Sequence, residues 1–255
     1  GMMLRTGVRA ERIVCGRYVI KTSTPELAKV LGVDEAYWSS PSSGLIDASS
    51  GEVFDFTSFN VAPTQHVPVG RLNEAGQPIL VPMRWGLVPS WAKDAKSAAR
   101  LINARSETVS TRPAFRAAFK RRRCLVPADG YYEWQRTASG KQPYFLHPPD
   151  DATLLFAGLY EFWRSPHGDE VWSCTILTMD AAPPLDTVHD RMPVMLGSDR
   201  AATWLSPSET PSVDDLRPAL FDPAAFALTP VSTYVNNARN NGPRCIEPIA
   251  GPTTE

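Results

Sequence analysis

The chain has 255 residues, of which 43% are hydrophobic and 21% are charged, a composition typical of a folded protein with a substantial core. Its 26 basic and 27 acidic residues give a net charge of −1. The total charge therefore does not predict nucleic-acid binding, which would need a local basic face. No apolar run has the length of a membrane span or the flanks of a signal peptide.

The beginning of the chain contributes little to a core. Residues 5–12 contain four charged side chains and almost no apolar material, and Gly1 before Met2 is typical of the remnant of an expression tag. We therefore expect residues 1–13 to be a tag remnant and a misplaced leader, and residues 14–255 to form a single domain.

Most of the remaining chain consists of short runs rich in β-branched and aromatic residues, a pattern typical of strands. The runs that predict strands are Cys15–Ile20, Val53–Val61, Ile79–Leu87, Cys124–Ala128, Tyr131–Gln135, Leu154–Tyr160, Val171–Thr178 and Ala227–Tyr234. The 24 prolines stand mostly between these runs, which favours strands that turn corners over long helices.

A few helices are expected between the strands. Thr24-Pro25-Glu26 predicts a helix start with proline in the first turn, and Gly32 predicts its end. A second helix is expected over Arg112–Phe119, and a third includes Ala201–Leu205. The fold class that follows is α+β, with a mainly antiparallel β-sheet or barrel core and a few flanking helices.

Two stretches, residues 38–51 and 206–216, predict surface insertions, and neither an internal repeat nor a clear linker interrupts the chain. The four cysteines are widely separated and have no CxxC spacing; they are Cys15, Cys124, Cys174 and Cys245. This spacing argues against a zinc site or a disulfide framework and favours a reducing cytoplasm. With no metal ligand set and no Gly-rich phosphate loop in the sequence, we expect neither a metal nor a nucleotide cofactor.

Six segments combine polar side chains with aromatic ones. They are Cys15–Tyr18, Asn60–Thr64, Arg84–Pro89, Ile102–Glu107, Asp129–Trp134 and His189–Pro193. Together they offer a thiol, a carboxylate, an imidazole and several guanidinium groups, which is the set that nucleophilic catalysis with proton transfer needs.

Each residue also has a structural interpretation. Cys15 could be a small core residue on a strand. Glu133 could be the solvent-facing member of an alternating strand. His189 beside Asp190 could form a surface ion pair that contributes little to stability.

Together and in this order, the motifs resemble those of the SOS-response-associated peptidase (SRAP) family, from Cys15 to about Pro248. The matching stretches are Cys-Gly-Arg-Tyr, Asn-Val-Ala-Pro-Thr, Arg-Trp-Gly-Leu-Val-Pro-Ser-Trp, Asn-Ala-Arg-Ser-Glu-Thr, Arg-Cys-Leu-Val-Pro-Ala-Asp-Gly-Tyr-Tyr-Glu-Trp and His-Asp-Arg-Met-Pro. The resemblance implies a SRAP-like fold and a role in the DNA damage response.

It also implies a chemistry for Cys15, which in this family becomes the first residue of the mature protein and traps abasic sites in single-stranded DNA. The α-amine condenses with the sugar aldehyde to a Schiff base, and the thiol of the same residue closes a thiazolidine ring. An α-amine, with a reference pKa of about 7.7–8.0, is partly neutral at cellular pH, whereas a lysine at about 10.4 is not. By resemblance, Asn103 places the amine or the sugar, Glu133 is the general acid/base, and His189 assists proton transfer.

The resemblance implies a DNA-binding face as well. Its arginines would hold phosphates, its tryptophans would stack on bases beside the lesion, and its hydroxyls would add contacts. These residues are Arg17, Trp85, Arg105, Ser106, Trp134, Thr178 and Arg191. The implied partner is single-stranded DNA with abasic sites, bound by a monomer in the bacterial cytoplasm, at the nucleoid when on DNA, without a membrane or a metal.

One departure from the family pattern matters. Cys15 follows Val14 rather than an initiator methionine, so its nitrogen is an amide and cannot form a Schiff base. A GTG codon is read as methionine where it initiates translation, and a start at Val14 would leave Cys15 N-terminal once that methionine is removed. Self-cleavage before Cys15 is one alternative, and a true extension that prevents crosslinking is another.

Two other functions are compatible with the same residues. One is a cysteine peptidase, a hydrolase that acts on itself or on other proteins through Cys15 and His189. The other is a noncatalytic module that binds single-stranded DNA. The crosslinking protein would also have lyase-like chemistry through its Schiff base.

Overall fold

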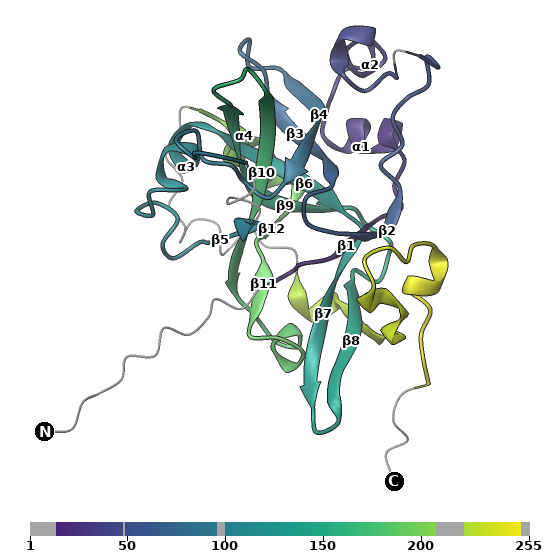
Figure 1. Ribbon diagram of the computed structural model, residues 1–255. Coiled ribbons are helices and arrows are strands. Elements are labelled where there is room, and N and C mark those ends of the chain that lie inside the picture. Colours follow the sequence, from purple (N-terminus) through teal and green to yellow (C-terminus); the bar gives the residue numbers. More distant parts are fainter. Residues whose placement is uncertain (1–13, 48, 96–99, 208–221, 251–255) are drawn as a thin grey trace, which may run out of the picture.

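The computed structural model describes residues 14–47, 49–95, 100–207 and 222–250. Two β-sheets form the centre of this part of the chain, and short helices lie around them (Figure 1). Most strand pairs are antiparallel. The predicted α+β class with a mainly antiparallel core is therefore confirmed.

One sheet closes on itself to form a barrel. Its five strands are β3 (His66–Leu72), β4 (Pro78–Trp85), β6 (Arg123–Ala128), β9 (Leu154–Arg164) and β10 (Glu170–Asp180). They pair in the order β10-β4-β3-β6-β9, and an additional pairing of β9 with β10 closes the ring. The pairing of β4 with β10 is parallel. Three short strands extend the barrel: β5 (Asn103–Arg105), β11 (Arg191–Pro193) and β12 (Met195–Leu196).

The other sheet has five antiparallel strands in the order β13-β8-β7-β1-β2. They are β1 (Tyr18–Ile20), β2 (Ser58–Val61), β7 (Gly130–Thr137), β8 (Gly140–His147) and β13 (Ala227–Pro230). Tyr18 joins this sheet to the barrel, because its ring packs edge-on against Trp85 and Phe156 with centroids 5.1 Å and 6.1 Å away. The two sheets thus share one large hydrophobic core.

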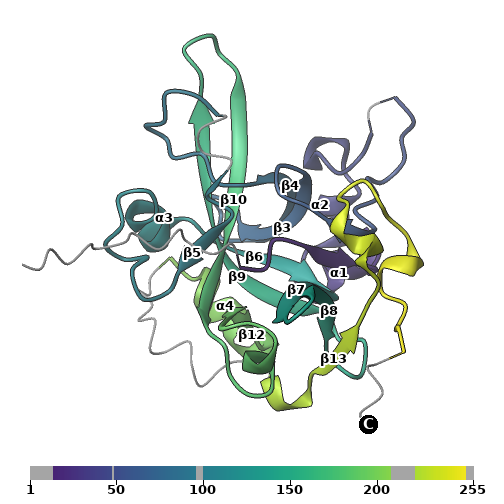
Figure 2. The same cartoon turned by 60° about the horizontal axis from the view of Figure 1, so that its bottom comes forward.

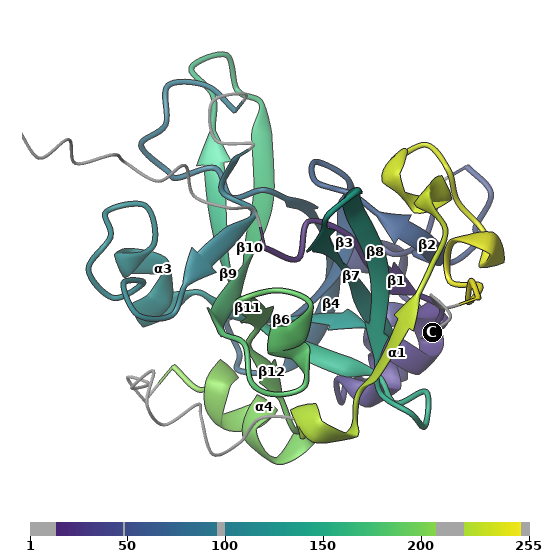
Figure 3. The ribbon, with the colours of Figure 1, turned by 90° about the horizontal axis from the view of Figure 1, so that it is seen from below.

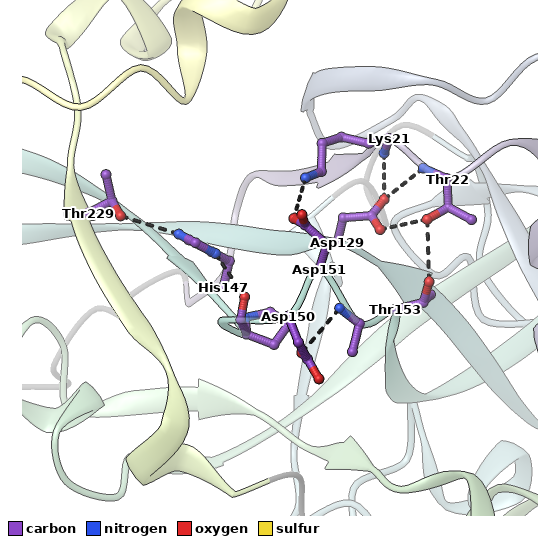
Figure 4. Close-up of polar contacts among 10 residues, drawn as sticks. Lys21, Thr22, Asp129, His147, Asp150, Asp151, Thr153 and Thr229 are labelled. Carbon is purple, nitrogen blue, oxygen red and sulfur yellow. Dashed lines mark hydrogen bonds and ion pairs between the residues drawn. The ribbon is translucent and has the colours of Figure 1, made fainter.

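The short connection between β6 and β7 sets the register of the second sheet. The Asp129 carboxylate accepts hydrogen bonds from the backbone N–H groups of Lys21 and Thr22 and from the Thr22 hydroxyl, as Figure 4 shows. At Gly130, φ is +156° and an added Cβ would lie 2.5 Å from the Phe145 ring. An aspartate followed by glycine therefore holds the end of β1 against the start of β7.

The helices cover the flanks of the sheets. They are α1 (Thr24–Val30), α2 (Glu35–Trp38), α3 (Arg116–Arg121) and α4 (Ser198–Leu205), with 3₁₀ turns η1 (Pro41–Ser43), η3 (Leu185–Thr187), η5 (Pro223–Ala225), η6 (Thr233–Asn236) and η7 (Pro243–Cys245). Helix α3 contacts β9 and β6, and α4 contacts β6, β9 and β12. Figures 2 and 3 show α3 and α1 on opposite sides of the barrel. Among the described residues no helix is long and apolar enough to cross a bilayer.

The predicted helices have direct counterparts. Helix α1 begins after Ser23, which forms a capping box with Glu26, and Gly32 follows its end with φ +67°. Helix α3 starts four residues later than expected, and α4 contains the predicted 201–205 segment. Most of the predicted insertion at 206–216 lies outside the described residues, whereas the 38–51 segment buries Leu45 completely.

Two long strands, β3 and β8, are not among the strands predicted from the sequence. Strand β3 contains Pro68 and Gly70, and β8 contains Pro143. Proline and glycine are unfavourable inside strands, so the local sequence of these segments does not predict a strand. In the fold Pro68 lies opposite Pro82, and a Cβ at Gly70 would lie 2.7 Å from the Leu31 side chain. Close packing of α1 against β3 explains the glycine.

Candidate active site

Cys15 and Glu133 meet because β1 pairs with β7. Tyr18 lies opposite Tyr131 in this pairing, so the residues just before β1 run along the side of β7. The backbone N–H of Cys15 donates to Oε1 of Glu133 over 2.6 Å. Both residues are buried, and Cys15 has a left-handed φ of +46°. Glu133 is therefore not the solvent-facing strand residue of the structural interpretation.

Burial controls the charge of both groups. It raises the pKa of Glu133 to about 8, although hydrogen bonds from the backbone N–H groups of Cys15 and Trp134 oppose the shift; the nearby charge of Asp190 adds to it. Burial, reinforced by Glu133, also raises the pKa of the Cys15 thiol well above its usual range. Near neutral pH the site therefore holds a carboxylic acid and a thiol in their neutral forms, so Glu133 can donate a proton.

His189 shares a cavity with Glu133. The cavity measures about 610 Å³ and is lined on one side by β7 and β8, from Glu133 to Lys141, and on the other by residues 186–190. Nδ1 of His189 lies 3.1 Å from Oδ1 of Asp190 and also 3.1 Å from the backbone nitrogen of Arg191. The Cys15 sulfur is buried, and Glu133 touches both Cys15 and this cavity. The structure thus brings three of the four predicted catalytic residues into one neighbourhood.

Asn103, the fourth, lies on β5 opposite Ile176 of β10. Its side-chain oxygen and nitrogen are both buried and have no hydrogen-bond partner among the described residues. A buried amide without partners is unfavourable and calls for an explanation, such as a ligand that completes its hydrogen bonds. No hydrogen bond joins Asn103 to Cys15 or Glu133 within the described ranges.

Strands β5, β10 and β11 bring together four of the residues assigned to DNA. Arg105 is exposed, whereas Ser106 and Thr178 are buried and Arg191 is 6% exposed. The Arg191 guanidinium donates to both oxygens of Glu107, to Asp180 and to the Thr178 carbonyl. A phosphate at Arg191 would therefore have to replace protein carboxylates. Their contact with DNA stays a prediction.

Arg17 and Trp134 lie against the C-terminal segment. Nη1 of Arg17 donates to Oδ1 of Asn60 at 3.0 Å and to the Val235 carbonyl at 2.8 Å. The Trp134 indole N–H donates to Oδ1 of Asn236 at 2.7 Å. Both side chains are partly exposed, and these contacts set their orientation while leaving part of their surface open.

The structure contradicts the base-stacking role predicted for Trp85. It is fully buried, its indole N–H donates to the Ile102 carbonyl over 3.0 Å, and it packs against Tyr18. It has no open face for a base, so the stacking role assigned to Trp85 was wrong. Trp91, in the loop after β4, is 67% exposed. Its position after Pro89-Ser90, beyond the strand, is the signal that could have identified it.

No group of three or more histidine, cysteine or acidic side chains suited to a metal ion is found in the described part of the chain. All four cysteines are free and buried.

Comparison with known proteins gives consistent matches. The model of the family described as SOS response associated peptidase (SRAP) matches residues 14–238. An abasic site processing protein, YoqW of Bacillus subtilis, is 35% identical over 237 residues, which cover 92% of this chain and 99% of the relative. The abasic site processing protein HMCES of Xenopus tropicalis is 37% identical over 223 residues, which cover 75% of this chain and 66% of the relative.

Solved structures show the same fold. A protein from Bacteroides thetaiotaomicron superposes with a TM-score of 0.74 at 22% identity, covering 92% of this chain and 100% of its own. A phage-related protein from Bordetella bronchiseptica has a TM-score of 0.63 at 30% identity, covering 85% and 94% of the two chains.

Proposed function

This chain belongs to the SOS response associated peptidase (SRAP) family, and from that premise we propose that it processes abasic sites by capturing them covalently in single-stranded DNA through Cys15. Its relatives are named abasic site processing proteins. The role would be one in the DNA damage response, carried out by a soluble monomer in the cytoplasm, with residues 14–255 as one domain.

The observation that carries the proposal is the 2.6 Å contact between the Cys15 nitrogen and the buried carboxyl group of Glu133. If that nitrogen is a free amine, it can add to the aldehyde of an abasic sugar. Glu133, whose pKa is raised to about 8, donates a proton to the departing hydroxyl, and water leaves as the Schiff base forms. The thiol then adds to the imine carbon and its proton passes to nitrogen, which closes a thiazolidine.

The ring closure requires nitrogen and sulfur on one residue, so Cys15 must be N-terminal. We propose that translation starts at Val14, which is also the first residue matched by the family model. Removal of the initiating methionine would then leave the amine of Cys15 beside Glu133. His189, in the cavity next to Glu133, would assist proton transfer at the opened sugar, and the unpartnered amide of Asn103 would bind the sugar or the amine.

Substitution of Cys15 tests the function directly. In protein that begins at Cys15, Cys15→Ala should abolish covalent capture of an abasic oligonucleotide in denaturing electrophoresis, whereas Cys124→Ala, which removes another buried thiol, should retain it. Cys15→Ser should form only a reducible Schiff base. Covalent capture by Cys15→Ala equal to that of the parent would contradict the role of Cys15, whereas DNA binding by the parent without any covalent capture would leave a noncatalytic binding module as the function.

One observation favours self-cleavage as a second activity. The bond between Val14 and Cys15 has its nitrogen within hydrogen-bond distance of an acid, and protonation of that nitrogen would help it leave as an amine. The thiol of Cys15 could attack the Val14 carbonyl, and water would then release residues 1–14. This is the peptidase chemistry that the family description implies, confined to the chain itself.

The exposed tryptophan of the loop after β4 is proposed as a base-stacking residue in place of Trp85. Trp91→Ala should weaken binding of single-stranded DNA roughly 5- to 150-fold, which corresponds to one lost stacking contact, without a change in thermal stability. Trp85→Ala should instead destabilise the fold by about 3–5 kcal/mol, because it leaves a cavity in the core. Fluorescence anisotropy and thermal unfolding would measure the two effects, and unchanged affinity of Trp91→Ala would refute the assignment.

A further inference from the structure

A second cavity, of about 590 Å³, opens at another place on the barrel and shares no lining residue with the cavity at Glu133. Its polar, charged and aromatic lining residues include Arg71, Asn73, Glu74, Arg121, Tyr160 and Trp172. They come from β3 and the turn after it, from the end of α3, and from β9 and β10. In Figure 1 the turns of the β3–β4 and β9–β10 hairpins lie at the same end of the barrel, away from the β7–β8 hairpin.

Arg71 provides a fixed positive charge in this cavity. Its guanidinium carbon lies 5.3 Å from the centroid of the Tyr160 ring and 5.1 Å from that of Trp172, so two aromatic rings hold the cation in place. Nη1 donates to the Leu72 carbonyl over 3.0 Å. Trp172 also packs against Phe162, with ring centroids 4.8 Å apart, yet it remains 40% exposed, which leaves part of its aromatic surface open to a ligand.

Arg121 provides a second charge. It is one of three consecutive arginines, but its neighbours are already bound. Arg122 pairs with Glu161, and Arg123 donates to backbone carbonyls that include those of Phe119 and Trp204. Arg121 is exposed and lines the cavity. Across the described ranges, neither Arg71 nor Arg121 is in an ion pair.

We propose that this cavity binds a nucleotide, with the base stacked on Trp172 and the phosphate held between Arg71 and Arg121. Two arginines without carboxylate partners among the described residues suit a phosphate, and an open indole beside them suits a base. The cavity has the size of a small-molecule site, about 300–1,000 Å³. Glu74, an acidic lining residue, disfavours additional phosphates close to the first. The ligand is either a free nucleotide or one nucleotide of a DNA strand, and its binding requires neither Cys15 nor a lesion.

The test follows the indole N–H signal of Trp172 by NMR, identified by its loss in Trp172→Phe. The probes are dTMP, inorganic phosphate and a lesion-free oligothymidylate, each added to the full chain. We expect dTMP or the oligothymidylate to shift the Trp172 signal, and Arg71→Gln or Arg121→Gln to weaken that binding about tenfold each. Arg116→Gln, which removes an exposed arginine of α3 that does not line the cavity, is the matched control and should bind as the parent does.

A shift by dTMP supports a free nucleotide as the ligand, and a shift by the oligothymidylate alone supports a nucleotide within a strand. The proposal is overturned if neither probe moves the signal, or if Arg121→Gln, a surface change that leaves the core intact, binds as tightly as the parent. It is also overturned if phosphate binds as tightly as dTMP, because the base would then contribute nothing. Covalent capture of abasic DNA is a separate measurement, so failure here would leave the function of Cys15 untouched.

Discussion

Protein that begins with Cys15 is expected to retain abasic single-stranded DNA through denaturing electrophoresis, whereas the 255-residue chain is expected not to retain it. The difference should be all or none, because a peptide nitrogen cannot condense with an aldehyde. An α-amine has a pKa of about 7.7–8.0 and is partly neutral at pH 7.5. The two forms carry the same Glu133 and His189, so the comparison isolates the state of one nitrogen.

Intact-mass spectrometry of the long form decides between the remaining alternatives. Capture together with a loss of residues 1–14 would establish self-cleavage, and Glu133→Gln should then slow the loss. Capture by a long form of unchanged mass would contradict the requirement for an N-terminal amine. A form beginning at Cys15 that fails to capture, although it folds and binds DNA, would contradict the proposed chemistry altogether.

The contact between Cys15 and Glu133 shows the limit of motif analysis. The motifs were sufficient to name the two residues, but they are 118 positions apart, and their meeting depends on the pairing of β1 with β7. That pairing rests on the hydrogen bonds of Asp129 and on the space left by Gly130. Both residues lie within the motif that contains Glu133, so part of the motif holds the strands in register while another part carries the acid.

Burial was the property that the sequence predicted least well. Trp85 and Trp91 stand in the same motif, yet one is completely buried and the other is 67% exposed. The difference arises because Trp85 ends a barrel strand and faces Tyr18, whereas Trp91 lies in the following loop. In the same way Arg191, expected at the DNA, is held by Glu107 and Asp180. Strand periodicity alone does not tell which residues a distant strand will cover.

The second large effect is expected for Glu133→Gln in protein that begins at Cys15. Glutamine keeps the side-chain oxygen that accepts from the Cys15 nitrogen but has no acidic proton. Loss of a general acid should slow covalent capture by about 10²- to 10⁴-fold. The rate constant of capture under excess abasic oligonucleotide would measure the loss, with Gln135→Ala, at a neighbouring residue of β7 that also lines the cavity, for comparison.

The pH profile separates this role from a structural one. Burial raises the pKa of Glu133, so the acid form is lost only as the pH rises through this raised value. The amine changes in the opposite sense, because it becomes neutral above about 7.7–8.0. The parent should therefore show a bell-shaped rate profile, whereas Glu133→Gln should keep only the rise that belongs to the amine.

The stability of the folded protein should also fall as the pH rises, because Glu133 loses its proton. Because the folded-state pKa of Glu133 lies above the usual value of 4.5, the favourable contribution of the neutral acid is complete below pH 4.5 and falls as the pH rises toward 8. Glutamine has no charge to bury, so in the 255-residue chain the variant should lose less stability than the parent as the pH rises from 4.5 to about 8. A Glu133→Gln protein that is both slower and less stable at pH 8 would show that the carboxyl group supports the fold and is not the acid of the reaction.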